Sequence, residues 1–154
     1  MTFTVSSPPL DFSTLTLREA TPSQVRTTWR NNGASWAGKL SIEDYLAREH
    51  INGTGLLAGN GGIHYWIFVA TDDNSDAPEI YASCETIKKQ AVVKQVDGNH
   101  VVEQCWGIAS VYTPVKWRGR GVAREMLRRL KVWLDGEDAH CRFSVLYSDV
   151  GVRN

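Results

Sequence analysis

Hydrophobic and polar positions follow two different periods along this chain. Three segments rich in β-branched and aromatic residues come one after another, at 64–70, 80–93 and 101–112. Short polar connections rich in Asp, Asn and Gly separate them. A series of this kind predicts three strands that are joined as an antiparallel meander.

From residue 122 the apolar spacing becomes that of a helix. Apolar side chains fall at positions 122, 126, 127, 130, 133 and 134, with basic residues between them. One apolar stripe predicts a helix that packs against the sheet and ends near Gly136. Residues 141–147 again resemble a strand, and a strand–helix–strand crossover would make this strand parallel to the strand at 101–112.

Two further helices are predicted ahead of the meander. Thr21 and Gln24 form a capping-box pattern that begins a helix running to about residue 31. Ser41, with Asp44 three residues later, begins a second helix that runs to about residue 50. The segment 52–62 is rich in glycine and predicts a loop.

These elements predict a single domain of the α+β class. With a short strand at 15–19, the sheet would be an antiparallel meander followed by a β-α-β crossover. A chain of 154 residues is long enough for one such core. We expect a loose lead-in at 1–13, the domain at 14–151 and a short tail at 152–154.

Charge and cysteine content narrow the function classes. Seventeen basic and seventeen acidic side chains cancel, so the chain lacks the overall positive field of a nucleic-acid-binding protein. Three cysteines without a CxxC pair argue against a disulfide framework or a zinc site, and no metal is expected. With no secretory signal or membrane span in view, the sequence favours the cytoplasm.

The segment 111–123 carries the strongest chemical signal. A predicted strand ends, a short loop follows, and Gly119 and Gly121 stand where the helix begins. The first N–H groups of a helix point outward without intrahelical partners, and glycines let an anion approach them. Arg118 and Arg120 add donors suited to phosphate oxygens. The segment therefore predicts a site for a pyrophosphate, although a plain glycine-rich connection would give a similar pattern.

The order of residues in this turn shows which of the known pyrophosphate-binding motifs it can match. A P-loop requires Gly-Lys-Ser/Thr, which is missing, and the third glycine of the dinucleotide fingerprint is missing as well. The pattern Arg118-x-x-Gly121-x-Ala123 resembles the R/Q-x-x-G-x-G/A signature of the GNAT acetyltransferases. Segments 17–20, 82–86, 107–111 and 143–151 are similar to the fungal lysine N6-acetyltransferase-like branch of that superfamily.

The resemblance implies an acetyl-CoA-dependent transfer of an acetyl group to a primary amine, with lysine as the acceptor by analogy. Val111 and Thr113 would contact the pantetheine arm of the cosubstrate through their main chain. The pyrophosphate would be held by the main chain of Arg118, Gly119, Arg120, Gly121, Val122 and Ala123.

Two carboxylates in the meander are candidates for the base that removes the proton of the amine. Glu85 lies in the middle of a strand within a segment that matches the family, so it is preferred over Glu103, and for both the alternative is a solvated strand residue. Cys84 is interpreted as a small buried side chain. Trp29 or Trp36 is a candidate for the wall of an acceptor cleft.

The resemblance also implies elements that do not follow the predicted strand at 141–147. In the family a further helix and a strand pair come next, whereas seven residues follow here. This favours an incomplete domain whose strand edge at 141–147 would self-associate. The alternative functions are a non-catalytic GNAT-fold protein that binds CoA at most, and nucleic-acid binding through the basic face at 120–131.

Overall fold

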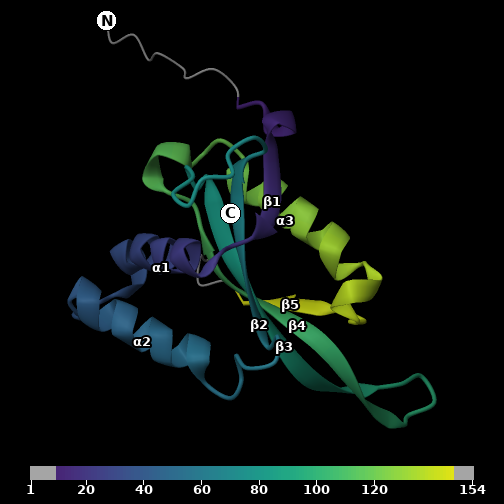
Figure 1. Cartoon of the computed structure of the whole chain (residues 1–154). Coiled ribbons are helices and arrows are strands. Elements are labelled where there is room, and N and C mark those ends of the chain that lie inside the picture. Colours follow the sequence, from purple (N-terminus) through teal and green to yellow (C-terminus); the bar gives the residue numbers. More distant parts are fainter. Residues whose placement is uncertain (1–9, 148–154) are drawn as a thin grey trace, which may run out of the picture.

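The computed structural model describes residues 10–147, which form one mixed sheet with helices on both faces (Figure 1). The strands are β1 (Leu15–Glu19), β2 (Ile63–Ala70), β3 (Ala82–Lys94), β4 (His100–Tyr112) and β5 (Ser144–Leu146). The helices are α1 (Pro22–Trp36), α2 (Ile42–Thr54) and α3 (Val122–Leu134). The predicted α+β class is confirmed, while most of the predicted lead-in, at 1–9, and the predicted tail lie outside the described residues.

The strands lie in the order β1-β2-β3-β4-β5 across the sheet. β1 to β4 pair as antiparallel neighbours, and β4 pairs with β5 in parallel after the crossover through α3. Both the predicted meander and the predicted crossover are therefore confirmed. β3 and β4 extend together beyond the other strands as a hairpin that projects from the body (Figure 1).

The sheet has a core on each face. α3 covers one face, where Met126 and Leu130 are fully buried against Phe68 and Trp106. α1 and α2 lie on the other face, where Trp29 packs with Leu46 (Figure 1). Within residues 10–147, no helix is both long and apolar enough to cross a membrane.

Tertiary packing extends two helices beyond their predicted ends. The prediction that α1 ends near residue 31 is wrong, because the helix continues through Gly33, where an added Cβ would lie 2.6 Å from Ile42 Cδ1 of α2. The prediction that α2 ends near residue 50 is wrong for a similar reason. An added Cβ at Gly53 would lie 2.8 Å from Tyr65 Oη, so this glycine lets the last turn of α2 approach the sheet. The predicted loop therefore begins after residue 54.

The last strand is shorter than predicted. Residues 141–147 were expected to be extended, but pairing is limited to Ser144–Leu146. The Gln104 side-chain amide donates to the carbonyl oxygens of Ala139 and His140, at 3.1 Å each, and the Cys141 thiol donates to the Leu134 carbonyl. These bonds hold the chain in a loop until it reaches the edge of β4.

Candidate active site

The turn between β4 and α3 requires glycine at two positions. Gly119 and Gly121 have φ values of 71° and 79°, in the left-handed region that side chains with a Cβ rarely adopt. Arg118 Nε donates to the Thr113 carbonyl oxygen at 2.9 Å, and its guanidinium lies 5.6 Å from the centre of the Tyr112 ring. This arginine therefore ties the turn back to the end of β4.

The helix that follows the turn begins without a side-chain cap. α1 and α2 are both capped by a side chain, whereas Gly121, the residue before α3, supplies none. The first bond of the α3 ladder joins Glu125 N to Gly121 O at 3.0 Å. Within the described part of the chain, no backbone acceptor is recorded for the N–H groups of Val122, Ala123 and Arg124. These amides can therefore donate to an anion.

A shallow pocket of about 250 Å³ lies over these amides, between Thr113, Trp117 and the first turn of α3. Among residues 10–147, the Thr113 hydroxyl and the Trp117 indole nitrogen are buried without a hydrogen-bond partner. The guanidinium of Arg120 lies 5.0 Å from the centre of the Trp117 ring. The unpaired amides, the glycine backbone and the two polar side-chain atoms without partners together fit a phosphate group.

β4 bends beside this turn because it contains one extra residue. Ser83 pairs with Tyr112 and Glu85 pairs with Ala109, so three steps along β4 oppose two along β3. Ser110 lies in this bulge with a φ of 51°. A bulge of this kind redirects side chains and interrupts pairing, and bulges are common next to active sites.

The outer edge of β4 is open beyond the bulge. β5 pairs only with residues 106–108 of β4, so among the described residues 109–112 have no strand partner on that side. An extended ligand can pair with such backbone groups as an added strand would. Val111 and Thr113, the two predicted pantetheine contacts, lie on this stretch and directly after it.

Glu85 faces the α1–α2 side of the sheet and is half-buried. Burial raises the pKa of its carboxyl from 4.5 to about 7, although a hydrogen bond with the Ser110 side chain opposes the rise and nearby Glu49 adds to it. A carboxyl with this pKa is present in both protonation states near neutral pH. It is therefore suited to proton transfer.

The surroundings of Glu85 are aromatic and acidic. Tyr65 lies opposite Glu85 on β2, and burial followed by the charge of Glu85 raises the pKa of this phenol to about 12. The ring of Trp29 meets the Tyr65 ring edge-on at 5.8 Å. Glu49 from α2 accepts from Arg48 Nη2 at 2.7 Å and supplies the second carboxylate of the cluster. A cation would be favoured here.

A cavity of about 630 Å³ opens on the same face of the sheet, next to Glu85. Ser110, whose side chain lowers the pKa of Glu85, lines it together with residues from α1, β3, β4, β5 and the position after β5. The other lining residues are Trp36, Ile87, Lys89, Gly107, Ile108, Ala109, Val145 and Tyr147. Trp36, one of the two tryptophans predicted to line an acceptor cleft, thus borders this cavity.

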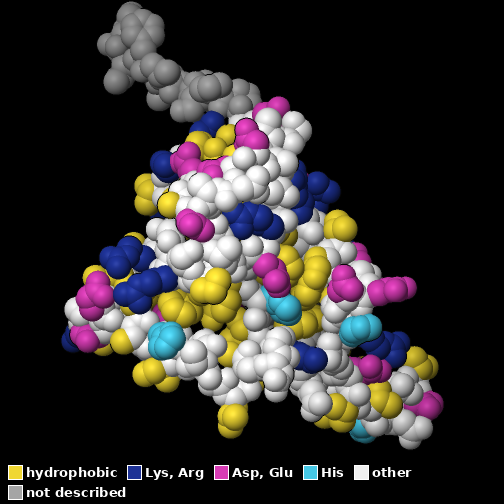
Figure 2. Space-filling view, viewed as in Figure 1, with side chains coloured by type: hydrophobic (Ala, Val, Ile, Leu, Met, Phe, Trp, Pro, Cys, Tyr) yellow, Lys and Arg dark blue, Asp and Glu magenta, His cyan; other side chains and the backbone are white. Residues whose placement is uncertain are grey.

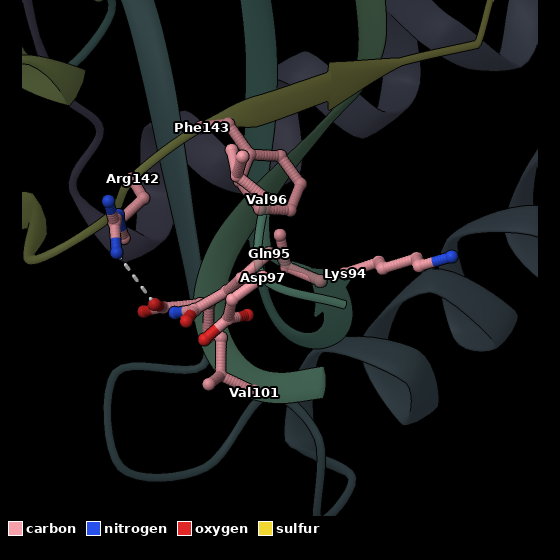
Figure 3. Close-up of a pocket in the computed structure, with 9 residues that line it drawn as sticks. Lys94, Gln95, Val96, Asp97, Val101, Arg142 and Phe143 are labelled. Carbon is pink, nitrogen blue, oxygen red and sulfur yellow. Dashed lines mark hydrogen bonds and ion pairs between the residues drawn. The ribbon is translucent and has the colours of Figure 1, made fainter. Parts of the chain in front are cut away.

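The structure separates Glu103 from this group. Glu103 pairs with Ala91 on the projecting hairpin and accepts from Arg142 Nη1 at 2.9 Å. It borders a second cavity, of about 580 Å³, between the hairpin and the segment before β5; Figure 3 shows Val96 and Phe143 at its wall. Ala91, the partner of Glu103, lies six residues beyond Glu85 on β3, which is about 20 Å along the strand. Glu103 is therefore bound in an ion pair away from the turn.

Cys84 and His64 also lie outside the cavity that Ser110 lines. Cys84 is buried in the core on the α3 face, and burial raises the pKa of its thiol to about 12, so it is not a thiolate. His64 Nδ1 contacts the Glu19 carboxylate, and its ring meets the Trp106 ring at 5.1 Å.

Two members of the site were not foreseen from the sequence. Ser110 was seen only as part of a strand, because nothing in a run of strand-forming residues marks the position of a bulge. Glu49 lies in the second helix, and only the fold brings it near Glu85. A carboxylate on the inner face of that helix was the one available signal.

No family model matches this chain. A lysine acetyltransferase of Yarrowia lipolytica is 30% identical over 117 residues, which are 75% of this chain and 29% of that protein. An uncharacterized protein of Saccharomyces cerevisiae is 25% identical over 158 residues, with 84% of this chain and 40% of that protein covered. The chain thus spans less than half the length of these curated relatives.

Several solved acetyltransferases have similar structures. A GCN5-related N-acetyltransferase from Kribbella flavida gives a TM-score of 0.60 at 21% identity, over 90% of this chain and 31% of that chain. A predicted acetyltransferase from Clostridium acetobutylicum, solved with acetyl-CoA, gives 0.56 at 18% identity, over 87% and 80%. Glucosamine-6-phosphate N-acetyltransferase from Arabidopsis thaliana gives 0.54 at 14% identity, over 89% and 84%. At these identities the similarity concerns the fold.

Proposed function

The chain has the fold of the GNAT acetyltransferases, and on that premise we propose that it transfers an acetyl group from acetyl-CoA to a primary amine. The observation that carries the proposal is the uncapped, glycine-flanked start of α3 beside the open edge of β4. Free lysine is the proposed acceptor, which is supported by the sequence similarity to a lysine acetyltransferase.

The turn and the strand edge would hold the cosubstrate. The amides of residues 119–123 and the side chains of Arg118 and Arg120 face the phosphates in this proposal. The amide of Arg118, which was also predicted to do so, instead donates to the Val115 carbonyl oxygen at 3.2 Å. Main-chain groups of Val111 and Thr113 pair with the pantetheine arm. When bound, acetyl-CoA supplies the thioester whose carbonyl carbon is attacked by the amine.

Glu85 would take the proton that the acceptor must lose. A lysine ammonium has a pKa near 10.4, so forming the neutral amine at pH 7 costs about 4–5 kcal/mol. The ionised Glu85 carboxylate accepts this proton, directly or through one water, and Ser110 holds the carboxylate by its hydrogen bond. Glu49 adds negative charge that favours the incoming ammonium.

Acetylation of lysine measured from pH 6 to 10 tests this function, using release of the CoA thiol and the mass gain of the acceptor. Glu85→Gln is expected to lower kcat/KM about 100-fold at pH 7 and to recover toward pH 10, where the amine loses its proton unaided. Glu103→Gln, the matched control, is expected to keep the wild-type profile. Identical profiles for wild type and Glu85→Gln would remove Glu85 from the chemistry.

A further inference from the structure

Lys89 is held along the floor of the cavity that borders Ser110. Its backbone pairs with Cys105 of β4, but its side chain leans back along the sheet toward Gly107. A Cβ added at Gly107 would lie 2.6 Å from Lys89 Cε and 3.3 Å from Lys89 Cδ. The absence of a side chain at Gly107 therefore makes the room in which the lysine stem lies.

Among the described residues, no acidic side chain neutralises the charge of Lys89. Its side chain is exposed, and within residues 10–147 no acidic group forms an ion pair with it. Other exposed cations do have acidic partners, such as Lys116 with Glu79 and Arg142 with Glu103. An ammonium on a cavity wall without an acidic partner can bind the anionic end of a ligand.

Two groups of opposite charge lie at this cavity, and we call them its two poles. Lys89 lines the cavity, whereas Glu85 lies beside it, next to the lining residue Ser110. Glu85 lies opposite Ala109, whereas the stem of Lys89 lies over Gly107, two residues away on β4. Two residues of a strand span about 7 Å. Six covalent bonds of an extended chain span about 7 Å as well, since three bonds join successive Cα atoms 3.8 Å apart.

We propose that Lys89 binds the carboxylate of an ω-amino acid acceptor whose amine lies at the Glu85–Ser110 end of the cavity, about six bonds away. The inference rests on the proposed acetyl transfer. It defines the acceptor as a small molecule with a carboxylate and a distal amine. The apolar stem of such a molecule would lie along Trp36, Ile87 and Val145, which line the same cavity.

This spacing discriminates between neighbouring classes of amine. The α-amine and carboxylate of an amino acid are separated by only two bonds, which is too short to reach both poles. A diamine of the same length places a second ammonium beside Lys89, and the repulsion between like charges disfavours it. Lysine and 6-aminohexanoate both carry an amine six bonds from a carboxylate carbon, while cadaverine lacks the carboxylate.

Calorimetric binding of these three compounds, with CoA present, tests the inference without turnover. We expect wild type to bind lysine and 6-aminohexanoate with similar affinity and to bind cadaverine at least 10-fold more weakly. Lys89→Gln is expected to lose at least 10-fold in affinity for both carboxylates and to leave cadaverine unchanged or slightly tighter. Lys89→Arg, which keeps the charge, should restore most of the affinity.

Lys88→Gln is the matched control, since it removes the same charge from the adjacent residue, whose side chain points to the other face of the sheet. It should leave all three affinities unchanged. Any one of three results would overturn the proposal. These are equal affinity of wild type for lysine and cadaverine, an equal loss of affinity for lysine in Lys88→Gln and Lys89→Gln, and no binding of lysine by wild type. CoA binding and acetylation of other amines are measured separately. Failure of the acceptor assignment can therefore be distinguished from failure of acetyl transfer.

Discussion

Glu85 is a carboxyl in the middle of β3 that lies close to a cavity. Its carboxyl is half-buried beside Tyr65, and it interacts with Ser110, which lines the neighbouring cavity. Burial raises its pKa to about 7, and the neighbouring Glu49 acts in the same direction. An ionised carboxylate at this position therefore costs folding free energy, and a substrate ammonium would offset part of that cost.

Replacing Glu85 by Gln should reveal this cost as a pH-dependent gain in stability. The pKa is raised from 4.5 to about 7 in the folded protein, so the folded state binds more protons than the unfolded state between these values. The free energy of unfolding of the wild type is therefore expected to fall by about 2–4 kcal/mol relative to that of Glu85→Gln as the pH rises from 4.5 through 7. Little further change is expected above pH 7. Urea unfolding of both proteins at pH 5 and pH 8 measures this difference in the free energy of unfolding.

Glu103→Gln serves as the control for this titration. It removes an ion pair in which the Arg142 side chain is 71% exposed, so its effect should stay below about 1 kcal/mol at either pH. A stability difference between wild type and Glu85→Gln that is the same at pH 5 and pH 8 would contradict the raised pKa.

At the scale of elements, the hydrophobic period and the helix-capping patterns together predicted the order and type of the α-helices and strands, but tertiary contacts decided where several of them end. Gly33 and Gly53 are typical helix stops, yet both lie inside helices because a neighbouring element packs where their side chains would be. The bonds from Gln104 shorten β5. Such contacts join residues far apart in sequence, so no local pattern reveals them.

The bulge in β4 is the element-scale feature that connects Ser110 to the pKa of Glu85. The hydrogen bond with Ser110 lowers that pKa against the effect of burial. Ser110→Ala is therefore expected to raise the pKa further and to move the acidic limb of the pH–rate profile to higher pH. An acidic limb that stays in place or moves to lower pH would exclude this role for Ser110.

Across the whole molecule, the glycine turn at 118–123, which is the proposed cosubstrate site, could be predicted from the sequence because its residues are contiguous. The two φ-positive glycines and the uncapped helix start lie within a few positions of each other. The proposed acceptor cavity could not be predicted in the same way, because α1, β3, β4 and β5 each contribute to its wall. Self-association through the edge of the 141–147 segment stays a prediction; of that segment, β5 is the outermost strand described.

Calorimetry with CoA is the most direct test of the central claim that this chain holds its cosubstrate at the start of α3. Gly121→Glu places a carboxylate and a Cβ among the proposed phosphate donors, at a φ of 79°. Gly98→Glu is the matched control, because Gly98 also has a positive φ, of 89°, but lies at the tip of the projecting hairpin.

We expect wild type and Gly98→Glu to bind CoA with the same affinity and Gly121→Glu to bind it at least 100-fold more weakly, a loss of about 3 kcal/mol. Circular dichroism of the three proteins would establish that all are folded. Equal affinity of folded Gly121→Glu and wild type for CoA, or no binding of CoA by wild type, would contradict the account.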